Sequence, residues 1–152
     1  MIDITAEMLN PHHFQMDIYQ RENLEDMAIV LNSFLTDYKY PVVINSGLRD
    51  MALQIKLDAP NPPKKSCHLV GLAADIHDES NKLLEYILSN LDRAKELRLF
   101  FEHPNWTPTW CHIQGIPPKS GRRFFVPDSS PEKCSRWSGV YDHQYDFTSS
   151  AK

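Results

Sequence analysis

Apolar residues recur at helical spacing in two stretches of the chain, and polar residues fill the positions between them. This period predicts one helix over residues 21–38 and another over residues 80–96, each with one face turned to a core. Asp78 and Ser80 both stand where a side chain can cap the second helix. The apolar positions that define the two faces are Leu24, Met27, Ala28, Leu31, Phe34 and Leu35, then Leu83, Leu84, Ile87, Leu88, Leu91 and Ala94.

Short runs of β-branched and aromatic residues predict several strands. A helical turn or two is expected over residues 51–57, before a proline-rich loop. Residues 66–76 are expected to form two extended pieces around a bend at Gly71, because glycine tolerates backbone angles that other residues avoid. The strands are expected over residues 40–45, 97–102, 109–114 and 122–126.

Two helices mixed with short strands predict an α+β fold, with a small antiparallel sheet flanked by helices. The chain has 152 residues, which fits one domain. We expect this domain to occupy residues 1–127, with an irregular tail of the same domain over 128–152. The pattern does not give the strand order.

Composition and charge argue against two classes of function, nucleic-acid binding and membrane spanning. The net charge is −4 and the pI about 5.9, so no basic surface for nucleic acid is expected. No apolar run is long enough to span a bilayer, and the first residues lack a signal-peptide pattern. We therefore expect no membrane partner, a cytoplasmic location as synthesised, and a monomer. Three cysteines are too few for a disulfide framework.

The stretch from Ser66 to Asp75 carries the most chemistry. His68 and Asp75 lie seven positions apart around Gly71 and two alanines, so a bend there brings an imidazole and a carboxylate together as metal ligands. A satisfied core histidine with a capping aspartate would explain the same residues. His112 offers a third ligand. Two histidines and one aspartate with one open position are what a catalytic zinc site needs.

Three elements in order resemble a known family. Ser46-Gly47-x-Arg49, then His68-x-x-Gly71-x-Ala73-x-Asp75, then Trp110-x-His112 look like the signature of the zinc D-alanyl-D-alanine carboxypeptidases and peptidoglycan endopeptidases. That family includes phage endolysins and shares its fold with the hedgehog signalling domain. The similarity covers roughly residues 20–127 and extends to Glu102-His103-Pro104, Thr107-Pro108 and the Pro118-x-Ser120-Gly121-x-Arg123 stretch.

The resemblance implies Zn²⁺ bound by His68, Asp75 and His112. It also implies that Arg49 holds a carboxylate or polar group of a peptidoglycan peptide, which suits a planar guanidinium; an ordinary ion pair is the other interpretation of Arg49. Ser66 and Trp110 are expected to contact the substrate. The reaction would be hydrolysis of a peptide bond next to a D-amino acid, on the cell wall after lysis, export or particle assembly.

The general base departs from the family pattern. Many relatives have an acidic residue three positions before the second histidine, where this chain has Thr109. Glu102 and His103 are the nearest candidates, and on one strand they would point to opposite faces. We favour Glu102, because a carboxylate near zinc can accept the proton of water and return it to the leaving amine. His103 stays open as the alternative.

Two other functions remain compatible with the sequence. The first is a catalytically inactive zinc-binding module of the same fold, serving a structural or wall-recognition role, which Thr109 in the usual base position would suit. The second is an α+β binding domain without a metal. The sequence does not distinguish a carboxypeptidase from an endopeptidase.

Overall fold

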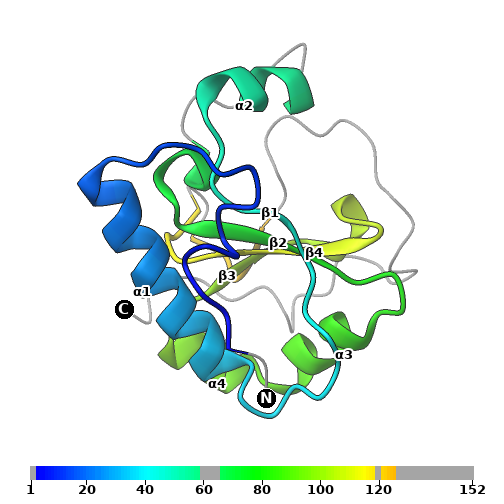
Figure 1. Ribbon diagram of the computed structural model, residues 1–152. Coiled ribbons are helices and arrows are strands. Elements are labelled where there is room, and N and C mark those ends of the chain that lie inside the picture. The colour runs from blue at the N-terminus through cyan, green and yellow to red at the C-terminus, as the bar shows by residue number, and fades with distance from the viewer. Residues whose placement is uncertain (1–2, 59–65, 119–120, 126–152) are drawn as a thin grey trace.

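The computed structural model describes residues 3–58, 66–118 and 121–125 (Figure 1). The described chain is a mixed α+β structure with one five-stranded sheet in the order β1-β2-β4-β3-β5. The strands are β1 (Ile44–Ser46), β2 (Ala73–His77), β3 (Phe100–Glu102), β4 (Trp110–Gln114) and β5 (Phe124–Phe125). The helices are α1 (Ile18–Phe34), α2 (Met51–Asp58), α3 (Lys82–Ser89) and α4 (Leu91–Glu96), with short 3-10 helices η1 (Cys67–Val70) and η2 (Pro104–Trp106). This confirms the predicted α+β class.

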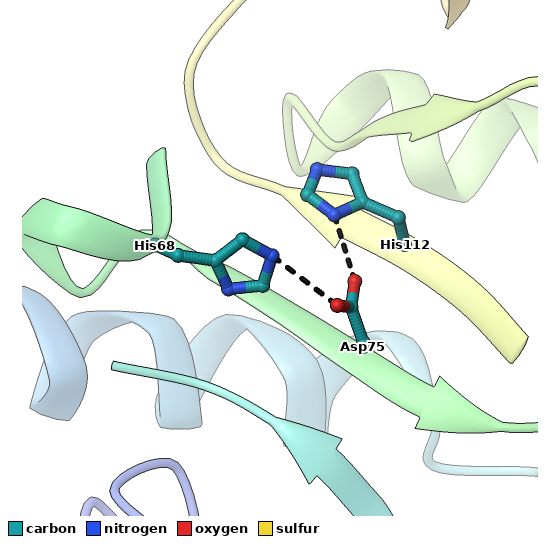
Figure 2. A group of neighbouring side chains, drawn as sticks. All are labelled: His68, Asp75 and His112. Atoms are coloured by element: carbon teal, nitrogen blue, oxygen red, sulfur yellow. Dashed lines mark hydrogen bonds and ion pairs between the residues drawn. The ribbon is translucent and has the colours of Figure 1, made fainter. Parts of the chain in front are cut away.

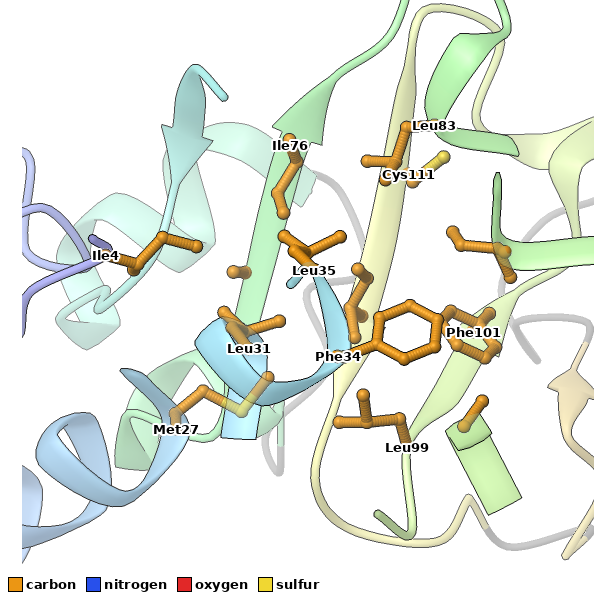
Figure 3. Close-up of a cluster of buried hydrophobic side chains, with 14 of the residues drawn as sticks. Ile4, Met27, Leu31, Phe34, Leu35, Ile76, Leu83, Leu99, Phe101 and Cys111 are labelled. Carbon is orange, nitrogen blue, oxygen red and sulfur yellow. The ribbon is translucent and has the colours of Figure 1, made fainter. Parts of the chain in front are cut away.

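The core lies between α1 and one face of the sheet (Figure 3). Phe34 of α1 packs against Phe101 of β3, with their ring centroids 6.0 Å apart. The apolar side chains of α3 and α4 join the same cluster, and Ile76, Cys111 and Ile113 face it from the central strands. Because side chains alternate along a strand, residues 75 and 112 face the other side of the sheet.

The first helix starts and ends earlier than its apolar pattern predicts. Asp17 caps it: its carboxylate accepts a hydrogen bond from the backbone N–H of Gln20, whose side chain accepts one from the N–H of Asp17. Such a reciprocal pair satisfies two N–H groups that the helix itself leaves unbonded. The helix ends at Phe34, with Leu35 as its C-cap.

The predicted helix over residues 80–96 is wrong as one element, because it divides at Asn90 into α3 and α4. The side-chain amide of Asn90 donates to the backbone carbonyl of Tyr86, and this local bond competes with continued helix. The N-cap residue of α3 is Asn81, whose side chain makes no capping hydrogen bond. Asp78 caps the helix in its place, because its two carboxylate oxygens accept from the N–H groups of Leu83 and Leu84. Of the two capping residues that the sequence offered, Asp78 and not Ser80 therefore accepts these hydrogen bonds.

The sequence predicts an extended piece before Gly71, and this prediction is wrong, because residues 67–70 form η1. Ser66 precedes this turn and accepts a hydrogen bond from the N–H of His68 through its Oγ atom. Gly71 ends the turn with φ 84°, a left-handed conformation that suits glycine. A β-carbon on Gly71 would also lie 3.1 Å from the carbonyl oxygen of Gln20 in α1.

The strands differ from the prediction mainly at their ends. Arg98 has φ 57°. Because this left-handed conformation interrupts the extended backbone, the strand expected from residue 97 begins only at Phe100. The strand predicted over residues 109–114 is confirmed, although it begins one residue later, at Trp110. The strand predicted over residues 40–45 is shorter than expected and lies at Ile44–Ser46. The sheet is not wholly antiparallel, because β5 runs parallel to β3.

Residues 126–152, and with them the expected irregular tail and the end of the last predicted strand, lie outside the described residues. Within the described part of the chain, no helix is long and apolar enough to cross a membrane.

Candidate metal centre

Three elements bring His68, Asp75 and His112 together on the face of the sheet opposite the core cluster (Figure 2). His68 lies on η1, Asp75 in the middle of β2 and His112 in the middle of β4. Asp75 and His112 are direct partners in the antiparallel pairing of β2 with β4. Side chains at such paired positions stand next to each other on one face. The sequence prediction that these residues converge is confirmed.

The separations between the donor atoms suit a metal ion. One atom from each residue can be chosen so that all three lie within 4.8 Å of one another. His68 Nε2 is 3.4 Å from Asp75 Oδ2, and His112 Nδ1 is 2.8 Å from Asp75 Oδ1. Tetrahedral zinc with bonds of 2.0–2.1 Å separates its ligand atoms by about 3.4 Å. The first distance fits this value. The second ends on the other carboxylate oxygen and is a hydrogen-bond contact, which a metal bound by His112 would have to replace.

The imidazole of His68 is oriented by a backbone carbonyl. Its Nδ1 lies 2.8 Å from the carbonyl oxygen of Gly47, so Nδ1–H donates there and Nε2 faces Asp75. Metal-binding histidines commonly use their second nitrogen in this way. The backbone N–H of Arg49 donates to the carbonyl of His68, which ties η1 to the segment after β1.

His112 is oriented with the opposite nitrogen toward the centre. Its Nδ1 faces Asp75, and its Nε2 lies 2.7 Å from Oε1 of Gln114. The amide nitrogen of Gln114 donates to the carbonyl of Ile116. The structure therefore offers Nε2 of His68 and Nδ1 of His112 as the two nitrogen ligands.

The carboxylate of Asp75 is shared between the histidines and Arg49. Arg49 Nη2 donates to Asp75 Oδ2 at 2.9 Å, and Arg49 Nε donates to Ser46 Oγ at 2.9 Å. Burial alone would raise the pKa of Asp75, but the charges and hydrogen bonds of His68 and His112 outweigh it and lower that pKa. Asp75 is therefore ionised and ready to bind a cation.

The two imidazoles differ in their affinity for protons. Burial lowers the pKa of His68, and the attraction of Asp75 offsets this only in part. Burial acts in the same direction on His112, but the hydrogen bond and charge of Asp75, helped by the charge of Glu102, raise its pKa above the ordinary value. A metal would therefore find His68 neutral and would compete with a proton for His112.

The Ser46-Gly47-x-Arg49 element supports the centre at several points. Ser46 pairs with Asp75 in the β1–β2 register. Gly47 passes so close to the N-terminal segment that a β-carbon there would lie 2.0 Å from the carbonyl oxygen of Leu9. The next N–H, of Leu48, donates to that same oxygen. This close passage explains why a glycine is required at the position whose carbonyl orients His68.

Glu102 and His103 have different surroundings, but they do not share a strand as expected, because β3 ends at Glu102 and His103 is the N-cap of η2. The β3–β4 register pairs Phe100 with Gln114 and Phe101 with Ile113. The next pair in this register would be Glu102 with His112, and the charge of Glu102 acts on that imidazole. His103 is buried in the turn that begins at η2, where its Nδ1 accepts from the N–H of Asn105 and its ring contacts Trp106.

The other side chains near the ligands in sequence differ in whether they lie on the side of the metal centre or away from it. Ser66 is the cap of η1 described above, and Trp110 is half-buried on the same face of β4 as His112. His77 is exposed at the end of β2, and its Nε2 lies 3.8 Å from Oε2 of Glu79. Cys111 faces the core side, where its thiol donates to Asp78. Trp137 and His143 lie outside the described residues.

Sequence reasoning missed two neighbours of His112. Gln114 was placed on its face by strand alternation, but no signal gave the hydrogen bond. Phe125 of β5 contacts the imidazole edge-on, with ring centroids 5.9 Å apart, and this contact depends on a strand pairing that the sequence did not reveal.

The donor set fits a divalent metal that accepts both nitrogen and oxygen. Two neutral imidazoles and one carboxylate match zinc, and each imidazole has a hydrogen-bond acceptor on its other nitrogen. The described residues thus form a site that could hold a metal ion. The chain matches no family model, no curated protein and no solved structure in the comparisons made.

Proposed function

We propose that this protein is a zinc-dependent peptidase that hydrolyses peptidoglycan peptide bonds next to a D-amino acid. The observation that supports it best is the convergence of His68, Asp75 and His112, with Arg49 bonded to the same carboxylate. The three ordered sequence elements that resemble the peptidoglycan-cleaving metallopeptidases lie together around this centre. The hedgehog-type metallopeptidase fold is part of the same proposal.

In this proposal His68 Nε2, Asp75 and His112 Nδ1 hold Zn²⁺. A zinc ion bound there would polarise the scissile carbonyl and lower the pKa of a bound water toward about 7. The protein supplies the ionised carboxylate, the neutral imidazole of His68 and the fixed ring orientations, so that little reorganisation is needed on binding.

Arg49 is the proposed substrate-binding residue. Its hydrogen bonds to Ser46 Oγ and Asp75 Oδ2 fix the guanidinium beside the centre, on a side chain that is 11% exposed. A guanidinium so placed can bind a peptide carboxylate or carbonyl oxygen through further N–H groups. Ser66 and Trp110 flank the ligands in sequence and complete the proposed substrate contacts.

Glu102 is the proposed general base. It stands on the strand next to β4, and its charge already acts on His112. A carboxylate there can take the proton from the attacking water and return it to the leaving amine. His103 is the second candidate, although its Nδ1 already accepts a hydrogen bond from Asn105.

The test uses the full chain with purified peptidoglycan, mass spectrometry of the released fragments, and elemental analysis of the protein. We expect stoichiometric zinc and cleavage next to a D-amino acid. His68→Ala and His112→Ala should lose both zinc and cleavage. His77→Ala is the matched control, because this exposed histidine is two residues from Asp75 on β2, and it should retain both.

A catalytically inactive zinc-binding module is the second candidate. The supporting observation is Thr109, which stands exposed in the position where many relatives have an acidic base. Stoichiometric zinc with no released fragments, and no change with Glu102→Gln, would favour this function. Absence of bound zinc after loading would contradict both candidates and leave an α+β binding domain without a metal.

A further inference from the structure

Gln114 connects the imidazole of His112 to the backbone beyond β4. Its side chain is 6% exposed, and both ends of its amide are bonded. The amide nitrogen donates to the carbonyl of Ile116 at 2.7 Å, and Oε1 lies 2.7 Å from Nε2 of His112. Because a carbonyl oxygen only accepts, the amide cannot be turned around without placing two oxygens in contact.

This fixed orientation determines where the proton of His112 resides. Oε1 of Gln114 can only accept, so Nε2 of His112 must carry a hydrogen and donate it. In the neutral imidazole the lone pair is then on Nδ1, which faces the carboxylate of Asp75 at 2.8 Å. A lone pair and a carboxylate repel each other unless a cation or a proton lies between them.

We propose that Gln114 is a positioning residue of the metal centre, which holds His112 in the tautomer that binds metal through Nδ1. The opposite neutral tautomer would satisfy Asp75 without a metal, but it would direct the Nε2 lone pair at Oε1 of Gln114. For the neutral imidazole, Gln114 therefore disfavours a closed, metal-free contact of His112 with Asp75, whereas the protonated imidazole can donate to both acceptors. The inference rests on the proposed metal, and it is independent of whether the protein cleaves peptides.

Each of the two histidines has a hydrogen-bond acceptor at the ring nitrogen that faces away from Asp75, but the two acceptors differ in kind. For His68 the acceptor is the backbone carbonyl of Gly47, which no side-chain substitution removes. For His112 it is a side chain, so its contribution can be measured by mutation. Removing an acceptor of this kind typically lowers metal affinity by about 10–100-fold.

The experiment measures zinc affinity by competition with a chromophoric chelator, with zinc as the probe. Gln114→Leu removes the acceptor at similar size, and we expect affinity to fall about 10–100-fold. Gln114→Glu keeps an oxygen that can face Nε2–H but sets its second oxygen against the carbonyl of Ile116, so its zinc affinity should lie between those of the wild type and Gln114→Leu. Ile113→Val is the matched control: it weakens packing on the core face of the same strand and should leave affinity within about twofold.

A folded Gln114→Leu with wild-type zinc affinity would overturn the inference. If Gln114→Leu does not fold, ¹⁵N NMR of the zinc-loaded wild-type protein decides. We expect His112 Nε2 to carry the hydrogen and Nδ1 to bind the metal, and the reverse assignment would contradict the proposal. Loss of peptidase activity alone does not bear on it, because affinity and tautomer are read directly.

Discussion

The carbonyl oxygen of Gly47 lies 2.8 Å from Nδ1 of His68, so a backbone atom outside the ligand set selects the nitrogen that faces Asp75. The orientation of one proposed ligand therefore depends on the path of the chain after β1. That path is fixed in turn by the contact of Gly47 with the N-terminal segment at Leu9.

Gly47→Ala should damage both stability and metal binding. The added β-carbon would lie 2.0 Å from the carbonyl oxygen of Leu9, so the backbone must shift, at a cost of about 1–3 kcal/mol. Urea unfolding and zinc titration measure the two effects. Gly115→Ala is the control, because its nearest contact would be Met27 Sδ at 3.6 Å. Equal stability of the two variants would contradict the close passage.

Asp78→Ala should destabilise the protein without affecting zinc affinity. The Asp78 carboxylate accepts from the N–H groups of Leu83 and Leu84 while 3% exposed, and losing such a cap costs about 2 kcal/mol. Ser80→Ala, at an exposed position, should change the free energy of unfolding by less than about 0.5 kcal/mol. The opposite ranking in chemical denaturation would show that Ser80 is the cap after all.

Glu102→Gln should lower turnover by at least about 100-fold while zinc stays bound, because the amide cannot accept the proton of water. Cleavage rates on peptidoglycan and zinc content, measured on the same preparation, separate catalysis from binding. His103→Gln is the comparison. If it abolishes cleavage with zinc retained while Glu102→Gln does not, the base is His103.

Zinc binding should displace about one proton from its proposed ligands near pH 6.5 and fewer near pH 8.5. The pKa of His112 is raised, so it still holds a proton that zinc must displace, and zinc affinity falls as the pH falls. The pKa values of His68 and Asp75 are lowered, so both have already lost theirs. ¹⁵N NMR of the two imidazoles, recorded without and with zinc, counts the displaced protons separately from those that zinc-bound water releases. Loss of a proton from both imidazoles on zinc binding near pH 6.5 would contradict the difference between the histidines.

The three candidate ligands could be predicted from the sequence, because their residue types lie close to a glycine bend and on one alternating strand, and because the three ordered elements resemble a known family. The position of Cys111 on the opposite face of β4 from His112 follows from the same alternation. These features are local, and local periodicity is what a single sequence records most directly.

Features that depend on long-range pairing could not be predicted in this way. The parallel pairing of β5 with β3, and so the contact of Phe125 with His112, depends on residues far apart in the chain. The conformation of residues 66–70 was missed for another reason. Small residues around Gly71 are consistent with two extended pieces, but the cap at Ser66 and the left-handed Gly71 stabilise a turn.

The three proposed donors differ in how far they can move. Those on β2 and β4 are held by neighbouring hydrogen-bonded strands, whereas that of His68 is carried by a four-residue turn. An ion of larger radius than zinc would therefore be accommodated by displacement of η1 and not by spreading of the sheet. The amides of Gln20 and Asn23 hold the carbonyls of Leu69 and Val70, so α1 would resist that displacement and thereby favour small ions.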